Sequence, residues 1–241
     1  MSRRGWGGAA AVTIGALALL AAAGRLGAVA LGETPAAALT STTAQPALLP
    51  ARLVTPPAVP AAVAPVADPR APTAPPADVS WQVWHTLALP WSRSAGPTLA
   101  QGDAVGGFAH TPTGALLAAV QAAGRKVAAT DAGWRQVAAT MLAPGPGRDA
   151  WQAARARATL ATDPPAGTFA QVAGFQFLSY APDDAVVQLV TRGVDGGFGV
   201  VGLHVVWQDG DWRLVLAPDG GDATSQQRAA SLAGFVAWGG V

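Results

Sequence analysis

Cysteine and asparagine are both absent from the 241 residues, and lysine and glutamate occur once each, as Lys126 and Glu33. Without cysteine the chain forms no disulfide, no cysteine-ligated zinc site and no thiol nucleophile. Without asparagine it offers no acceptor for N-linked glycosylation. The fold must therefore be held together by packing rather than by covalent cross-links.

Charge of either sign is also scarce. Charged residues make up 12% of the chain and the formal net charge is only +1, whereas 51% of the residues are hydrophobic. A general nucleic-acid-binding domain needs a basic face that displaces counterions, so we expect no direct contact with nucleic acid. The apolar content is high enough to build a sizeable core, which excludes disorder throughout the chain.

The N-terminal segment is the longest apolar run. Arg3 and Arg4 precede an uncharged stretch from Gly5 to Gly24, and apolar residues resume after Arg25. About 20 apolar residues suffice to cross a bilayer. Basic residues before the run favour a cytoplasmic N-terminus. We therefore predict a cytoplasmic tip over residues 1–5, a transmembrane anchor over residues 6–31, and a single-pass protein of the cell membrane whose C-terminal domain is extracytoplasmic.

A cleavable signal peptide is the alternative for the same segment. Ala28-Val29-Ala30 has the small-x-small form that a signal peptidase requires, and the two arginines resemble the basic region of a signal peptide. The apolar run is longer than the roughly 7–15 residues of a typical signal-peptide core. This length favours the uncleaved anchor, and the alternative stays open.

Aromatic residues are missing from the next segment. Residues 33–78 contain eleven of the chain's twenty prolines and no aromatic residue, while fifteen of the sixteen aromatic residues lie at or after Trp81. Such a Pro/Ala-rich stretch buries too little surface to fold, and proline favours an extended polyproline II conformation. We predict a disordered linker over residues 32–78 and one extracytoplasmic domain over residues 79–241.

Three helices are predicted in the first half of this domain. Thr111 is a suitable N-cap and Pro112 occupies the first helical position, where its missing N–H costs nothing. Gly124 is a plausible end of this first helix. The alternation before it predicts one strand over 79–89, followed by a loop over 92–107. The second helix is predicted from Asp131 to Pro144 and the third from Arg148 to Leu160.

The second half changes to a period of two, which is typical of strands. Asp209-Gly210 is a two-residue hairpin signal of the type I′ kind, and such short connections require antiparallel strands. We therefore predict an α+β fold in which helices pack on a curved antiparallel sheet, like the nuclear-transport-factor-2 (cystatin-like) cone. The predicted strands span 169–178, 186–191, 199–208 and 212–217, with a last helix over 224–232 and an apolar segment at 235–238.

No residue pattern in the domain predicts a catalytic, cofactor-binding or metal site. The three histidines lack the spacing of a metal site, with His85 and His204 expected in strands and His110 beside a helix N-terminus. The acidic residues fall at predicted turns, which explains them without chemistry. The other candidates considered and set aside are Asp183, Asp184, Asp209, Asp211, the glycine-rich 193–197, Ser179 and Ser231; Arg192 remains a weak candidate for binding an anion in a pocket.

Several short segments of the domain together form a recognisable pattern. They are the stretch Gly107 to Ala119, Ala88-Leu89-Pro90, the glycine-proline repeat at 144–147 and the C-terminal Trp238-Gly239-Gly240. This pattern resembles an actinobacterial domain family found beside conjugation genes in integrative elements. The resemblance covers residues 79–241 and the anchor-plus-linker layout. Its members are distantly similar to the bitopic assembly factors of type IV secretion and conjugation machines, and the resemblance implies no catalytic residue.

The expected function is therefore that of a non-enzymatic, membrane-anchored scaffold or assembly component of a conjugative transfer or type IV secretion-like apparatus. Its expected partners are the membrane and other protein subunits of that machine, with self-association left open and no cofactor. The alternative is an exported cone domain that binds a small molecule or acts as an enzyme, because folds of this kind often contain a pocket.

Overall fold

The computed structural model describes residues 71–160 and 164–240. The predicted tip, the predicted anchor and almost all of the predicted linker lie outside these residues. None of the helices in the described ranges is long and apolar enough to cross a membrane. The described residues form an α+β fold with a mostly antiparallel sheet and three helices, which confirms the predicted fold class at that level.

The main sheet has six strands, and four of them follow one another as long antiparallel hairpins. Asp209 and Gly210 both have positive φ, 55° and 80°, as the predicted type I′ turn requires. The four predicted strands are confirmed with bounds that differ by up to three residues. They are β5 (Gln171–Ala181), β6 (Asp184–Arg192), β7 (Phe198–Gln208) and β8 (Asp211–Val215).

The C-terminal segment differs from its prediction, because residues 224–232 are not helical. Instead β9 (Gln227–Ala229) pairs with β7, and β10 (Val236–Ala237) pairs with β5. Since β6 lies between β5 and β7, the intervening residues cross β6 on their way from one strand to the other. Ladder hydrogen bonds to the sheet thus outweigh the local helical preference of this segment.

The predicted first strand, 79–89, is wrong, because the chain reverses within it. β1 (Val79–Trp84) and β2 (Leu87–Ser92) form an antiparallel hairpin. His85 and Thr86 make the turn with φ of 46° and 68°, so His85 lies in a turn and not in a strand. A His-Thr pair lacks the Asn-Gly or Asp-Gly signal by which such turns are recognised. The predicted loop 92–107 likewise contains a second small hairpin, formed by β3 (Leu99–Gln101) and β4 (Ala104–Gly106).

Helix α1 (Pro112–Ala128) begins as predicted, because the Thr111 side chain accepts a hydrogen bond from the Gly114 N–H at 3.1 Å. It does not end at Gly124. A Cβ atom at that position would lie 2.7 Å from a methyl carbon of Leu89, so the glycine allows β2 to approach the helix closely. Gly124 is therefore a packing residue and not a helix end.

The two shorter helices begin at other residues than predicted. Helix α2 (Trp134–Met141) is preceded by Gly133, so Asp131 is not its N-cap. Helix α3 (Pro146–Arg155) begins two residues before its predicted start and ends before Leu160. Asp131 makes a tertiary contact with Arg155 instead of capping α2, which sequence alone does not reveal.

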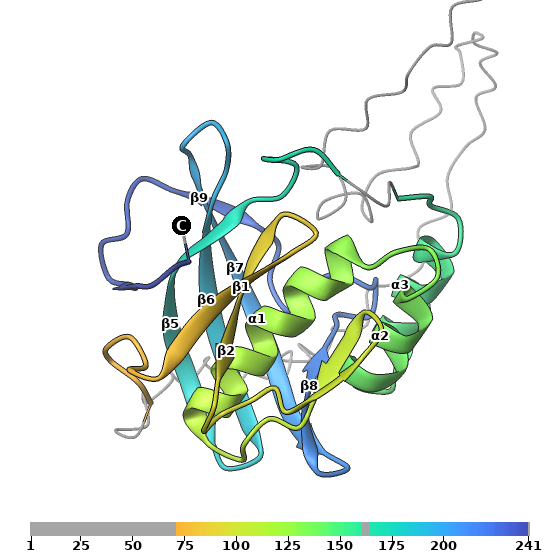
Figure 1. Ribbon diagram of the computed structural model, residues 1–241, viewed down its shortest axis with the longest axis horizontal. Coiled ribbons are helices and arrows are strands. Elements are labelled where there is room, and N and C mark those ends of the chain that lie inside the picture. Colours follow the sequence, from red (N-terminus) through yellow and green to blue (C-terminus); the bar gives the residue numbers. More distant parts are fainter. Residues whose placement is uncertain (1–70, 161–163, 241) are drawn as a thin grey trace, which may run out of the picture. The chain divides into compact units, whose positions relative to one another are not determined.

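Helix α1 lies across one face of the sheet beside the β1–β2 hairpin (Figure 1). It packs against β6, β7 and β8, while β2 packs between α1 and β5. The core between these elements consists of fully buried aliphatic and aromatic side chains, the largest being Phe175, Leu116, Leu117, Leu142, Leu203 and Leu214. Helices α2 and α3 extend this core beyond β8, where α2 also contacts β4.

Candidate functional site

A polar cluster at the start of α1 brings together two of the candidates weighed from the sequence, His110 and Asp183. The His110 ring stacks on Trp207 with centroids 4.0 Å apart and an interplanar angle of 10°. Its Nε2 lies 2.6 Å from the carbonyl oxygen of Pro182 and 2.9 Å from a carboxylate oxygen of Asp183. His110 therefore fastens the start of α1 to the β5–β6 turn and to the end of β7.

The other two histidines lie elsewhere. His204, on β7, is 2.7 Å from a carboxylate oxygen of Asp184 at the start of β6. The His85 ring lies edge-on to Trp84, with centroids 4.3 Å apart. Across residues 71–160 and 164–240, no group of three or more histidine and carboxylate side chains is arranged to hold a metal ion. Each histidine is thus placed by a local neighbour and the three do not form a shared site.

Asp211 has a role that its position beside a hairpin turn does not suggest. One carboxylate oxygen accepts a hydrogen bond from the Gly107 N–H at 2.7 Å, and the other accepts from Phe108 and Trp212 at 3.1 and 2.9 Å. The segment between β4 and α1 is thereby anchored to β8. The Gly107 to Ala119 motif therefore begins at backbone groups that Asp211 holds, which gives its first residues a structural role.

Replacing Asp211 by asparagine is expected to lower the free energy of unfolding by about 2 kcal/mol, because the amide group presents only one acceptor oxygen to three backbone N–H donors. Asp209→Asn is the matched control, since Asp209 lies on the other side of Gly210, is exposed and tolerates the same change. Urea denaturation followed by tryptophan fluorescence measures both variants. Equal losses in the two would contradict the anchoring role of Asp211.

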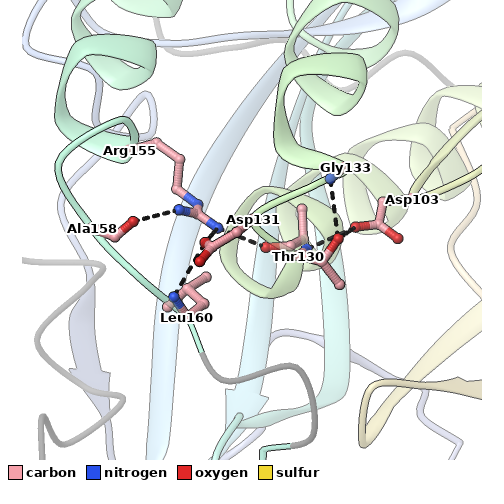
Figure 2. Close-up of polar contacts among 8 residues, drawn as sticks. Asp103, Thr130, Asp131, Gly133, Arg155, Ala158 and Leu160 are labelled. Atoms are coloured by element: carbon pink, nitrogen blue, oxygen red, sulfur yellow. Dashed lines mark hydrogen bonds and ion pairs between the residues drawn. The ribbon is translucent and has the colours of Figure 1, made fainter.

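A second polar network joins the three helices to the β3–β4 hairpin (Figure 2). Asp103 accepts hydrogen bonds from the backbone N–H and the hydroxyl of Thr130 at 2.7 and 2.6 Å. The buried Arg155 guanidinium donates to Asp131 at 2.7 Å and to the backbone oxygens of Ala129 and Ala158. The Arg155 hydrogen bond, followed by that of the Leu160 N–H, holds the pKa of the Asp131 carboxyl below its usual value.

Two further cations are buried in α1. Arg125 donates to the side chain of Gln121 at 2.8 Å and to the backbone oxygen of Asp103 at 2.7 Å, and its guanidinium lies 4.4 Å from the Trp84 ring centroid. Burial lowers the pKa of Arg125 to about 10, a shift that the negative charge of Asp103 partly opposes. Lys126 forms an ion pair with Asp222, and both side chains are at most 6% exposed. The charged groups of Arg125 and Lys126 therefore bind other residues of the same domain.

A shallow pocket of about 350 Å³ lies where the C-terminal segment crosses the sheet. Phe169, Val172, Val194 and Leu232 give it apolar walls, and Arg192 is the charged residue that lines it. Arg192 also lies over the Phe198 ring at 5.0 Å and has no carboxylate partner within the described part of the chain. Arg192 thus lines a pocket, and the glycine-rich residues 193–197 form the adjoining β6–β7 turn.

Neither of the two serines set aside in the sequence analysis has an adjacent base in the described residues. Ser179 lies in β5 opposite Val186, beside a register shift. The Ser231 hydroxyl accepts a hydrogen bond from the Ala233 N–H at 3.2 Å. No histidine among the described residues is hydrogen-bonded to either hydroxyl, so neither serine has the adjacent base that activates a nucleophile.

The outer edge of β1 is the surface that sequence analysis missed. In a hairpin with a two-residue turn, the residues flanking the turn exchange hydrogen bonds, and every second residue before them does the same. Gln82 and Ser80 therefore bond to β2, while the N–H and C=O groups of Val79, Trp81 and Val83 point away from it. No backbone partner for these groups occurs in residues 71–160 or 164–240. Val83 is 77% exposed.

Two edges of the main sheet are at least partly protected in the described residues. Leu142 and Ala143 cover β8, with the Ala143 N–H donating to Leu214 at 2.8 Å. β10 covers part of β5, and two register shifts interrupt the β5 ladder. β1 has an unbroken register, no proline and no lysine, and no strand in residues 71–160 or 164–240 pairs with its outer edge. Exposed edges without such protection are prone to pair with another strand.

Comparison with known proteins identifies a family domain that covers most of the chain. A family model described as "Domain of unknown function (DUF8175)" matches residues 41–237. The chain belongs to this family. The DUF8175 match begins inside the segment predicted as a linker and ends in β10, so it includes all but the last residues of the described fold. No curated protein and no solved structure matches the chain.

Proposed function

We propose that this DUF8175 protein is a non-enzymatic, membrane-anchored scaffold or assembly component of a conjugative transfer or type IV secretion-like apparatus. The observation that carries the proposal is the β1 edge, an unprotected strand with outward backbone groups at Val79, Trp81 and Val83. Main-chain hydrogen bonds to such an edge are a recurring mode of protein recognition. The partners are then other extracytoplasmic subunits, and nucleic acid is not contacted directly.

The absence of an enzymatic role is part of the proposal, and the use of the polar side chains supports it. An enzyme needs acid, base or nucleophile groups whose positions and surroundings suit a substrate. The described histidines, the buried cations and Asp211 are instead engaged in contacts between elements of the fold. We expect the same residues to matter for folding and not for turnover.

Assignment to a transfer machine rests on the resemblance of the Gly107 to Ala119 region and on the anchor-plus-linker layout. The cone likeness belongs to the same proposal. Two register shifts in β5 bend a strand and support a curved sheet, because bulges increase local bend and twist. A single anchor followed by a long linker would hold such a domain outside the membrane, near the other subunits of the machine.

Deleting residues 1–31 and exporting the remainder with a cleavable signal peptide is expected to abolish transfer or secretion activity, because the tether raises the local concentration of the domain at the machine. Single His85→Gln, His110→Gln and His204→Gln changes are expected to leave activity within about twofold at matched abundance, since surface substitutions are usually tolerated. Complementation of a deletion strain measures each variant. A stable, correctly localised His110→Gln protein without activity would overturn the non-enzymatic assignment.

The pocket at Arg192 favours a second candidate, an exported domain that binds a small apolar anion. Its walls are apolar and its one charged lining residue has no carboxylate partner in the described ranges. Arg192→Gln separates the two candidates in the same complementation assay. Loss of activity in this variant with normal abundance would favour the binding domain, whereas the scaffold proposal expects no change.

A further inference from the structure

We propose that β1 pairs with β1 of a second copy of this chain, as an antiparallel ladder centred on Trp81. This inference deepens the proposed function, because it names a partner of the β1 edge and relies on the membrane anchor. It rests on the backbone geometry of β1, on the sequence Val79-Ser80-Trp81-Gln82-Val83 and on the negative charge of Asp78 before the strand.

The outward backbone groups are self-complementary in this register. Val79 lies opposite the partner's Val83, and Trp81 lies opposite the partner's Trp81. These are the residues whose N–H and C=O groups point away from β2, so each pair exchanges two hydrogen bonds. The side chains match as well. Valine meets valine and tryptophan meets tryptophan, while Ser80 meets the partner's Gln82. Two-fold symmetry requires such self-complementary contacts.

Charge selects the antiparallel arrangement over a parallel one. β1 has no charged residue, but it is preceded by Asp78 and followed by His85. Hydrogen bonds from Ser92 and then Ser94 hold the pKa of the Asp78 carboxyl below its usual value, so Asp78 is negative at neutral pH. Antiparallel pairing brings Asp78 near the partner's His85. Parallel pairing in register would place the two Asp78 carboxylates side by side, which is unfavourable.

Trp81 at the centre of the ladder is already fixed in place. Its ring packs on Trp238 with centroids 4.7 Å apart, and a Cβ atom at Gly240 would lie 2.7 Å from Trp81 ring atoms. The side chain is therefore ordered before any partner arrives, and pairing loses little rotamer freedom at this position. Preorganisation of this kind lowers the entropic cost of association.

The length of the strand explains why a tether matters. Five residues from each copy fall far below the roughly 20–30 residues a side of a standard stable interface, so free domains should pair weakly. Seventy residues precede the described part of the chain, and the predicted anchor lies among them. Anchoring both copies in one membrane raises their local concentration, which favours a weak ladder.

Cysteine cross-linking tests the register directly, because the chain has no cysteine of its own. Two differently tagged full-length copies are co-expressed, one carrying Ser80→Cys and the other Gln82→Cys, both at exposed positions. In the proposed ladder these residues form a non-hydrogen-bonded pair with Cα atoms about 4.5 Å apart, within disulfide range. After mild oxidation of membranes, a band at twice the 24.0 kDa chain mass should contain both tags.

Control variants test whether the cross-link depends on the proposed register and on the β1 edge. Either variant expressed alone should give at least about tenfold less dimer, because a residue and its own twin lie more than about 7 Å apart in this register. Adding Val83→Lys to both copies should reduce the mixed dimer by about tenfold, since a lysine protects an exposed edge. Leu99→Lys is the matched control at another exposed hydrophobic position and should leave the dimer unchanged.

Two results would overturn the proposal. One is the absence of a mixed dimer above the level of either variant alone. The other is cross-linking of these cysteines to a different protein in place of the second copy, which would assign the edge to another subunit. Neither result alters the outcome of deleting residues 1–31, so failure of this inference and failure of the scaffold function are distinguishable.

Discussion

Replacing Lys126 by methionine is expected to lower the free energy of unfolding by about 3–5 kcal/mol, because it leaves a buried carboxylate without its partner. Lys126 and Asp222 join the last turn of α1 to the segment after β8, and their side chains are only 4% and 6% exposed. Urea denaturation of the purified full-length protein measures the loss. Tryptophan fluorescence is a suitable signal, since eight of the nine tryptophans lie at or after Trp81.

The double variant Lys126→Met with Asp222→Leu separates the ion pair from its surroundings. Replacing both charges with apolar groups is expected to recover most of the lost stability, because no unpaired charge stays buried. Asp149→Asn is the surface control, since Asp149 is exposed and its nitrogen–oxygen distance to Arg148 is 4.0 Å. Asp149→Asn should lower the free energy of unfolding by at most about 1 kcal/mol. A similarly small loss for Lys126→Met would show that Asp222 finds water or another partner.

Replacing Trp212 by alanine is expected to lower the free energy of unfolding by about 3–5 kcal/mol, because it opens a cavity in the core. Trp212 is 2% exposed and contacts the rings of Trp207, Tyr180 and His110. Its indole N–H donates to the Ala109 carbonyl at 3.0 Å. The side chain therefore supports both β8 and the start of α1, so its loss affects two parts of the fold.

Trp212→Phe distinguishes the cavity from the hydrogen bond. Phenylalanine keeps most of the ring volume and removes one of the two donors to the Ala109 carbonyl, leaving the Thr111 N–H, which should lower the free energy of unfolding by about 1 kcal/mol. Thermal and urea unfolding of the two variants provide the comparison. If phenylalanine is as damaging as alanine, the hydrogen bond and not the packing accounts for the role of Trp212.

The elements that sequence reasoning predicted correctly are those with strong local signals. Asp209-Gly210 specifies a tight turn by its own backbone preferences, and the strands on either side follow from a period of two. Thr111 and Pro112 specify the start of α1 in the same local manner. These elements are determined by residues close in sequence, so the sequence alone predicts them.

The missed elements depend on distant residues. His85-Thr86 turns only because β2 packs between α1 and β5, and β9 forms only because β7 offers it an edge. The site residues show the same limit. Asp211 meets Gly107 across 104 positions of sequence, and Lys126 meets Asp222 across 96.

The packing of Trp81 on Trp238 and Gly240 places the first strand of the described fold beside its last residues. A short peptide linking residue 240 back to residue 79 would therefore close the backbone with little rearrangement. New ends opened in the exposed β6–β7 turn, at Asp195-Gly196, would then give a circular permutant with the same sheet. In the native order, any protein fused after the C-terminus emerges next to the point where the preceding segment enters the domain.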